Sequence, residues 1–301
     1  MINGVINVYK EKGYTSHDVV AKMRGILKMK KIGHTGTLDP DAVGVLPVCM
    51  GKGTKLVDLI TDKDKTYETV LKLGITTDTQ DITGTVLKTA EVSASYEQME
   101  AVIKSYIGEY LQLPPMYSAI KVDGKKLYEL ARQGKEIERE RRRVMIKDIR
   151  IHHYIPEDQE IAMSVDCSKG TYIRTLLHDI GETLGCGGTM KSLIRTAVGK
   201  FRIEDSLTLT QIEALVRENN FDSYIIPVDD MFPDYMKIHV DREFHKYIYN
   251  GNAFSREHTI DHKAANSSEF VRVYDAENVF VGIYRYELDD ELYKPVKMFL
   301  S

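Results

Sequence analysis

The chain has 301 residues, of which 43% are hydrophobic and 29% are charged. Such a composition is typical of a soluble globular protein and excludes a disordered or fibrous chain, and the length suits one large domain and a small one at about 100–200 residues each. No apolar stretch reaches the roughly 18 residues of a membrane span, and the N-terminus does not resemble a signal peptide. The three cysteines, Cys49, Cys167 and Cys186, are widely separated and predict reduced packing residues. We expect a cytoplasmic protein without membrane contact.

The net charge of −4 is unevenly distributed along the sequence. Residues 204–301 hold ten Lys and Arg against 19 Asp and Glu, whereas residues 1–203 hold 31 against 26. The densest basic stretch, residues 125–150, contains the run Arg141-Arg142-Arg143. It is either a solvated face or a surface that follows a phosphate backbone, since Lys and Arg that neutralise phosphates supply much of nucleic-acid affinity.

In the first half of the chain, short strands alternate with helices. The tetrapeptide at 15–18, Thr-Ser-His-Asp, has the form of a capping box, and apolar residues follow at helical spacing. Residues 67–73 alternate with a period of two and predict a strand. Ser95 to Gln98 then opens a second helix.

The second half continues with strands at 144–155 and 161–167 and a turn at 168–170. A helical stripe from Ile173 to Leu184 ends at Gly185, and Thr210 is expected to cap one more helix. From about residue 236 the pattern changes to short apolar strands. This order, without regular βαβ alternation, favours an α+β fold over a doubly wound parallel sheet. We predict a large domain at 1–235 and a small β-rich domain at 236–301.

The most unusual segment is residues 33–47, Gly-His-Thr-Gly-Thr-Leu-Asp-Pro-Asp-Ala-Val-Gly-Val-Leu-Pro. Its glycines and prolines exclude a regular helix or central strand and predict a loop that presents Asp39 rigidly. Judged from spacing alone, Asp39 caps a helix at Pro40 equally well. A magnesium-dependent phosphoryl-transfer site at Asp39 and Asp41 is a weaker alternative, because no apolar strand directly precedes Asp39.

Residues 33–48 resemble the signature motif of the TruB-type family of bacterial pseudouridine synthases, which modify uridine 55 in the TΨC arm of tRNA. Further segments resemble the same family in the same order: residues 13–18, 65–67, 79–84, 113–121 and 167–174. The resemblance covers about residues 4–202. It implies a mixed, mainly antiparallel central sheet flanked by helices. The last 65 or so residues resemble, more weakly, a PUA-type small barrel.

The resemblance also implies roles for individual residues. Asp39 matches the essential aspartate, and Arg174 matches the arginine that pairs with it. Tyr67 matches the tyrosine that stacks on the target base and takes part in removing its C5 proton. A neighbouring guanidinium would keep the carboxylate ionised, and an aromatic ring would receive a base that has left its stack.

Substrate contacts are implied in the same way. His34 matches a histidine that fills space near the flipped nucleotide, and Tyr172, Asp81 and Leu193 match walls of the active site. With Arg141, Arg142 and Arg143 as phosphate contacts, these residues form the expected tRNA-binding surface.

The implied reaction breaks the bond from uracil N1 to C1′ and rejoins the base through C5. It changes no oxidation state and imports no group, so we expect neither a cofactor nor a metal. The expected partner is the TΨC stem-loop of tRNA, bound by a monomer; the alternative is a tRNA-binding or folding module without catalysis.

Two segments depart from the family pattern. Lys10 is followed by Glu11 where the family usually has Lys-Pro, and Leu193-Ile194-Arg195 replaces Leu-Arg-Arg. The second change removes one expected phosphate contact.

Overall fold

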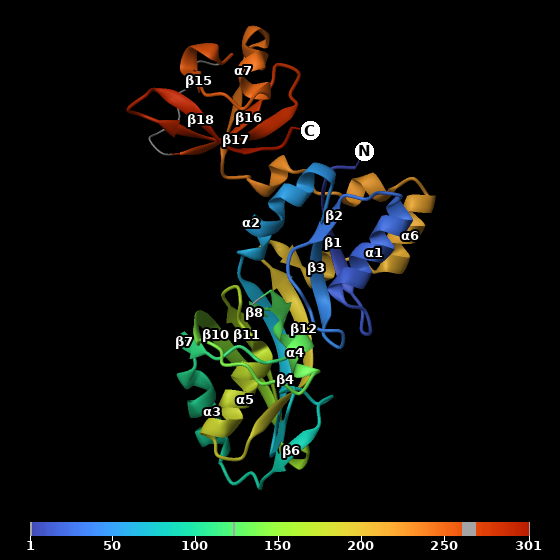
Figure 1. Ribbon diagram of the computed structural model, residues 1–301, viewed down its shortest axis with the longest axis vertical. Coiled ribbons are helices and arrows are strands. Elements are labelled where there is room, and N and C mark those ends of the chain that lie inside the picture. Colours follow the sequence, from blue (N-terminus) through green and yellow to red (C-terminus); the bar gives the residue numbers. More distant parts are fainter. Residues whose placement is uncertain (1, 123, 261–268, 301) are drawn as a thin grey trace.

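The computed structural model describes residues 2–122, 124–260 and 269–300, and two separate sheets dominate its architecture (Figure 1). The larger sheet contains β1 (Gly4–Lys10), β2 (Ile32–His34), β3 (Val43–Met50), β4 (Lys65–Leu73), β7 (Gly108–Gln112), β10 (Arg142–Ile155), β11 (Glu160–Cys167), β12 (Gly188–Val198) and β13 (Phe201–Arg202). Its main order is β1-β3-β12-β4-β11-β10-β7. The β3–β12 pair is parallel and the others are antiparallel, which confirms the predicted α+β class.

Helices cover this sheet in two groups. α1 (Ser16–Leu27) and α6 (Leu209–Arg217) pack with β1 and β3 around one apolar cluster. α3 (Tyr96–Ser105) and α5 (Ile173–Thr183) pack with β4, β10 and β11 around another. The short helices are α2 (Val57–Thr61), α4 (Leu127–Ala131) and α7 (His245–Tyr249). Among the described residues, no helix has the length and apolar character needed to span a membrane.

The helix starts follow from local capping. Thr15 and Asp18 form the predicted capping box of α1, and Ser95 and Gln98 form that of α3. The prediction that Thr210 caps α6 is wrong. Thr208 is the cap, because its hydroxyl accepts from the backbone N–H of Gln211, and Thr210 lies inside the first turn.

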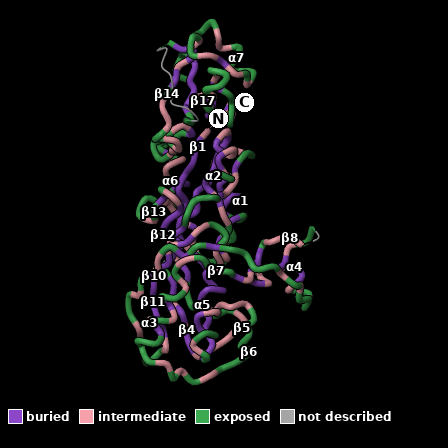
Figure 2. Tube along the Cα trace, turned by 90° about the vertical axis from the view of Figure 1, so that its left-hand side faces the viewer, coloured by how far each residue is buried: buried purple, intermediate pink, exposed green. Residues whose placement is uncertain are grey.

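The segment between β7 and β10 forms an excursion that includes the first part of the basic stretch, whereas residues 142–150 of that stretch lie in β10 itself. It contains β8 (Lys121–Val122), β9 (Lys125–Lys126) and α4, and it projects from the rest of the chain (Figure 2). A second small ribbon, β5 (Ile75–Thr77) with β6 (Val86–Thr89), leads away from the end of β4. Both insertions therefore extend from the sheet rather than contribute to it.

The second sheet contains β14 (Met236–His239), β15 (Phe254–Ser255), β16 (Phe270–Tyr274), β17 (Phe280–Glu287) and β18 (Leu292–Met298), in the order β14-β16-β17-β18-β15. The expected β-rich character of this part is confirmed, while the boundary at residue 235 stays a prediction. Ile283 and Phe299 join an apolar cluster with Val5 and Cys49 of the larger sheet. Lys55 donates to the carbonyl oxygens of Met298 and Leu300 at 2.9 and 3.2 Å. The two sheets thus share one packed joint.

Close packing of α5 on β12 makes a stability prediction. A Cβ added at Gly181 would lie 2.1 Å from the backbone nitrogen of Gly188, where no flexible side chain can yield. Gly181→Ala is therefore expected to lower the free energy of unfolding by at least ~2 kcal/mol, despite the better helix propensity of alanine. The matched control is Gly25→Ala in α1, where the added Cβ meets nothing within 4 Å. That change should stabilise by about 0.5–1 kcal/mol. Urea unfolding measures both, and equal effects would contradict the packing argument.

Candidate active site

The loop between β2 and β3 presents Asp39, and residues around the start of α1 hold it in place. The prediction that residues 33–47 contain no central strand is wrong for residues 43–47, which belong to β3, between β1 and β12. The Ser16 hydroxyl accepts from the backbone N–H of Leu38 at 2.9 Å, and the Gly13 N–H donates to the Pro40 carbonyl at 2.9 Å. Asp39 is therefore fixed from both neighbouring positions. These contacts explain why segments 13–18 and 33–47 occur together, because residues of the first segment hold the backbone of the second in place.

Arg174, in the first turn of α5, contacts the Asp39 carboxylate. Its Nε lies 3.1 Å from Asp39 Oδ2 and its Nη2 lies 3.5 Å from Oδ1. The Arg174 side chain is 6% exposed, whereas that of Asp39 is 41% exposed. The carboxylate thus keeps one side open to solvent while a buried cation supports the other.

The remaining nitrogens of Arg174 are also engaged. Nη1 lies 3.5 Å from Asp81 Oδ2 and donates to the Thr79 carbonyl at 3.2 Å, and Nη2 donates to the Tyr117 carbonyl at 2.8 Å. Asp81 itself accepts from the backbone N–H and hydroxyl of Thr83 at 3.0 and 2.6 Å. Asp81 therefore does more than line a wall, because it is the second carboxylate that fixes the guanidinium.

The ionisation of Asp39 reflects two opposing effects. Burial raises the pKa of Asp39 above its ordinary value, the positive charge of Arg174 lowers it, and the nearby Asp81 raises it. Arg174 is thus the main influence that favours the carboxylate form. An ionised aspartate with an open side can act as a nucleophile or stabilise positive charge.

Tyr67 lies on β4, opposite Arg195 on β12 and Val165 on β11. Tyr67 is buried, with 8% of its surface exposed. It shares an apolar cluster with Leu38, which precedes Asp39, and with Leu193 of β12. Burial raises the pKa of Tyr67, and the positive charge of Arg195 opposes this rise. The structure thus brings Tyr67, Leu193 and the Asp39 loop to one place.

His34 ends β2, just before the Asp39 loop. Its ring packs edge-on against that of His17 at 5.0 Å between centroids, and its buried Nδ1 has no hydrogen-bond partner among the described residues. Burial lowers the pKa of His34, and the proximity of His17 adds to this. His34 therefore favours the neutral form, which suits contact with an uncharged base.

Tyr172 caps the N-terminus of α5, two positions before Arg174. Its backbone N–H donates to Gln112 Oε1 at 2.7 Å, and Gln112 Nε2 donates to its carbonyl at 2.9 Å. Burial raises the pKa of the Tyr172 phenol, and Arg142 is among the charges that lower it. Arg142 of β10 is therefore close enough to influence the wall of the site.

The three predicted arginines differ in their surroundings, although all are exposed. Arg141 donates to the Leu111 carbonyl at 3.0 Å, and Arg143 forms an ion pair with Glu109 at 3.1 Å. The side chain of Arg142 forms neither a hydrogen bond nor an ion pair with the part of the chain that is described. Successive residues of a strand point to opposite faces. The side chain of Arg142 therefore points to the opposite face from the side chain of Arg143.

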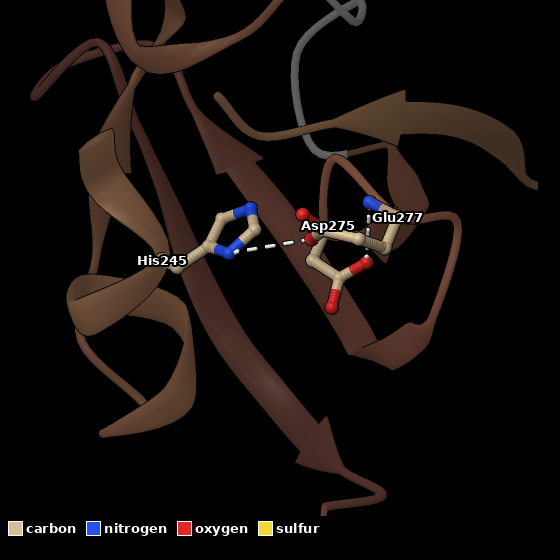
Figure 3. Close-up of side chains that lie close together, drawn as sticks. All are labelled: His245, Asp275 and Glu277. Atoms are coloured by element: carbon tan, nitrogen blue, oxygen red, sulfur yellow. Dashed lines mark hydrogen bonds and ion pairs between the residues drawn. The ribbon is translucent and has the colours of Figure 1, made fainter. Parts of the chain in front are cut away.

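A separate cluster of His245, Asp275 and Glu277 lies beside the second sheet, between α7 and the turn that joins β16 to β17 (Figure 3). His245 Nε2 accepts from the backbone N–H of Ala276 at 2.9 Å, which assigns the ring proton to Nδ1, 3.7 Å from Glu277. The Asp275 carboxylate accepts from Tyr249 and from the backbone of its own turn. With both histidine nitrogens occupied, this donor set fits a structural tie between α7 and a turn better than a metal centre.

Sequence reasoning missed two parts of the site. The contact of Asp81 with Arg174 depends on the fold of the segment after β5, which carries no periodic signal. The burial of Arg195 could have been suspected, since Arg195 follows Leu193 by two positions in a strand and therefore shares its face.

Comparisons with known proteins agree with this geometry. Residues 24–173 match the model of the TruB family pseudouridylate synthase N-terminal domain, and residues 174–232 match that of the tRNA pseudouridylate synthase B C-terminal domain. A tRNA pseudouridine synthase B of Lachnoclostridium phytofermentans is 55% identical over 99% of this chain and 100% of its own length. One from Clostridium novyi is 46% identical over 94% and 95%.

Solved structures give the same result for the fold. The structure of a Cbf5-Nop10-Gar1 complex is 25% identical with a TM-score of 0.71, and the match covers 99% of this chain and 85% of that chain. A structure of an H/ACA RNP bound to a substrate RNA containing 2′-deoxyuridine has the same TM-score at 23% identity.

The two family models cover residues 24–232 and the relatives match along the full chain, so the chain belongs to the TruB family of pseudouridylate synthases. It is a tRNA pseudouridine synthase, an enzyme that isomerises uridine in tRNA to pseudouridine.

The raised pKa of Asp39 predicts a cost in stability. A raised folded-state pKa means that stability is fully present below the unfolded-state value of about 3.9 and is lost as pH rises through the folded-state value. Asp39→Asn removes this ionisation. The variant should therefore melt above the wild type at about pH 7.5, by a difference that narrows as the pH falls to about 4, near the unfolded-state pKa. Thermal unfolding by circular dichroism measures it.

Asp41→Asn is the matched control on the same loop, because Asp41 is exposed and pairs only loosely with Lys12 at 3.8 Å. Its effect should stay within about 0.5 kcal/mol. A melting temperature of Asp39→Asn at or below that of the wild type at both pH values would contradict the assigned cost.

Proposed function

We propose that this enzyme isomerises uridine 55 in the TΨC arm of tRNA, with Asp39 as the nucleophile on a flipped-out uridine. The observation that carries the proposal is the contact between Asp39 and Arg174, at 3.1 Å. It combines an accessible carboxylate with a buried cation that favours its ionised form. The family of the chain and the names of its relatives support the choice of substrate.

Each neighbouring group has a part in this proposal. The target uridine leaves its stack at a cost of a few kcal/mol, which a fitted pocket offsets. Tyr67 is the aromatic surface that receives the base, with Leu193 and Tyr172 as walls, and His34 occupies the space that the base vacates. Asp39 reacts with the nucleotide while the N1–C1′ bond breaks, the uracil turns, and the new bond forms at C5.

The basic part of the chain is the proposed surface for the tRNA backbone. The arginines of β10 and the lysines of the projecting excursion flank the site, and Arg142 affects the electrostatics of Tyr172. The second sheet, which we propose to be PUA-like, lies within residues 236–301, where nine Lys and Arg stand against eleven Asp and Glu, so it contributes little to the attraction of phosphates. We also propose that the enzyme acts as a monomer in the cytoplasm.

The proposed nucleophile and position can be tested together. A tRNA transcript with tritium at uridine C5 is incubated with the protein, and released tritium is measured; primer extension after chemical marking of pseudouridine maps the position. The wild type should release tritium and modify position 55, and a transcript with cytidine at that position should remain unmodified. Asp39→Asn should lower the single-turnover rate by more than ~1000-fold while tRNA binding stays within about twofold.

Two outcomes would decide against the proposal. Modification at another position would reject uridine 55, and an active Asp39→Asn variant would reject the nucleophile. Binding of tRNA by the wild type without release of tritium would instead favour the tRNA-binding or folding module.

The surroundings of Arg142 and Arg143, both on β10, differ in a way that can be tested. Arg143 is paired with Glu109, whereas Arg142 has no such partner in the described chain and influences Tyr172. Arg142→Gln should therefore weaken tRNA binding more than Arg143→Gln and reduce the slope of log affinity against log salt by about 1. The double variant should weaken binding further at low salt. Affinities measured by filter binding across salt concentrations test this, and unchanged affinity of both variants would refute the surface.

A further inference from the structure

Arg195 is a buried cation without a counter-ion. It is 1% exposed, no carboxylate of the described residues forms an ion pair with it, and its Nη2 has no hydrogen-bond partner among them. Arg174 contacts two carboxylates, and Arg272 donates to three carbonyl oxygens. Because an uncompensated buried charge costs several kcal/mol, the position of Arg195 requires a reason.

The strand that carries Arg195 lies between the two strands that build the site. Arg195 is paired with Gly44 of β3 in parallel register and with Tyr67 of β4 in antiparallel register. Its Nε donates to the Val45 carbonyl at 2.7 Å, which fixes the side chain. A Cβ built on Gly36 would lie 3.6 Å from Nη1, so the guanidinium also borders the Asp39 loop. Arg195 therefore lies where the Asp39 loop and the Tyr67 strand meet.

The charged groups around Arg195 and Tyr67 do not neutralise Arg195. The groups that interact electrostatically with Arg195 are Tyr67, His34, Lys10 and Lys65, none of which supplies a carboxylate. Around Tyr67, burial raises the pKa most, Arg195 lowers it, and Cys167 and Asp39 raise it. Arg195 is thus the cation that favours the anionic form of the phenol.

We infer that Arg195 is the positioning residue for Tyr67: its buried charge holds the phenol against the target base and stabilises the phenolate oxygen that receives the C5 proton. This inference rests on the proposed function of the site. In this step, which follows formation of the C1′–C5 bond, the C5–H bond breaks and its electron pair forms the C5–C6 double bond of the uracil. The C6–N1 double bond becomes single and N1 takes a proton from water, while the C5 proton forms an O–H bond with the phenolate. The phenol then gives that proton to the hydroxide left by the water, so no further reactant is needed.

The test compares single-turnover pseudouridine formation by Arg195→Gln, Arg195→Lys, Tyr67→Phe and the double variant Arg195→Gln/Tyr67→Phe, between about pH 6 and pH 9. Arg272→Gln is the control for loss of a buried arginine, because Arg272 lies in the second sheet. Melting temperatures and tRNA affinities are measured for every variant. These controls separate a fault in folding or binding from a fault in the proton step.

Arg195→Gln should slow the step by at least ~10-fold near neutral pH, with tRNA affinity within about twofold and a rate that still rises at the alkaline end. Arg195→Lys should restore most of the rate, since it restores the charge. The double variant should be no slower than Tyr67→Phe, because Arg195 acts through the phenol.

The inference is overturned if the two single effects multiply in the double variant, or if the pH profile of Arg195→Gln matches that of the wild type. It is also overturned if Arg195→Lys is as slow as Arg195→Gln while both remain folded. If Arg195→Gln does not fold, the pH profile of Arg195→Lys decides. Failure of the proposed function is recognised separately, by a wild type that forms no pseudouridine at position 55 or an Asp39→Asn variant that remains active.

Discussion

A guanidinium buried between two carboxylates is the interaction on which this site depends. Arg174 contacts Asp39 on one side and Asp81 on the other, and two backbone carbonyls complete its environment. Removing Asp81, the more buried of the two carboxylates, would leave the charge of Arg174 partly uncompensated, which costs more than the lost contact alone. The arrangement also fixes the carboxylate geometrically, because a planar guanidinium that donates in several directions has little freedom to turn.

The larger sheet brings these groups together from distant parts of the sequence. β12 lies between β3, which follows the Asp39 loop, and β4, which carries Tyr67. α5, which begins at the site with Arg174, packs on the same β12. Residues near positions 39, 67, 174 and 195 therefore lie close to one strand, β12. The parallel pairing of β3 with β12 places the Asp39 loop, which precedes β3, beside this strand.

Local signals predicted much of the fold. Capping boxes gave the starts of α1 and α3, and alternation gave β4, because those patterns depend on neighbours in sequence. The start of α6 was misplaced because Thr208 and Thr210 offer similar hydroxyls, and only the backbone geometry distinguishes them. Resemblance suggested that Asp39, Tyr67 and Arg174 act together. The contact of Arg174 with Asp81 as well as Asp39, and the burial of Arg195 without a carboxylate partner, depend on long-range packing. No local sequence pattern predicts such packing.

The packed joint between the two sheets has an electrostatic consequence. Because Ile283 and Phe299 are buried among residues of the larger sheet, the second sheet cannot swing freely on a linker. Residues 204–235, which lead to that sheet, hold eight Asp and Glu against one Arg, so this negative charge stays at a fixed place beside a more basic body. A polyanion that approaches the enzyme is attracted by one part of its surface and repelled by another, and this polarity orients the substrate before any base is recognised.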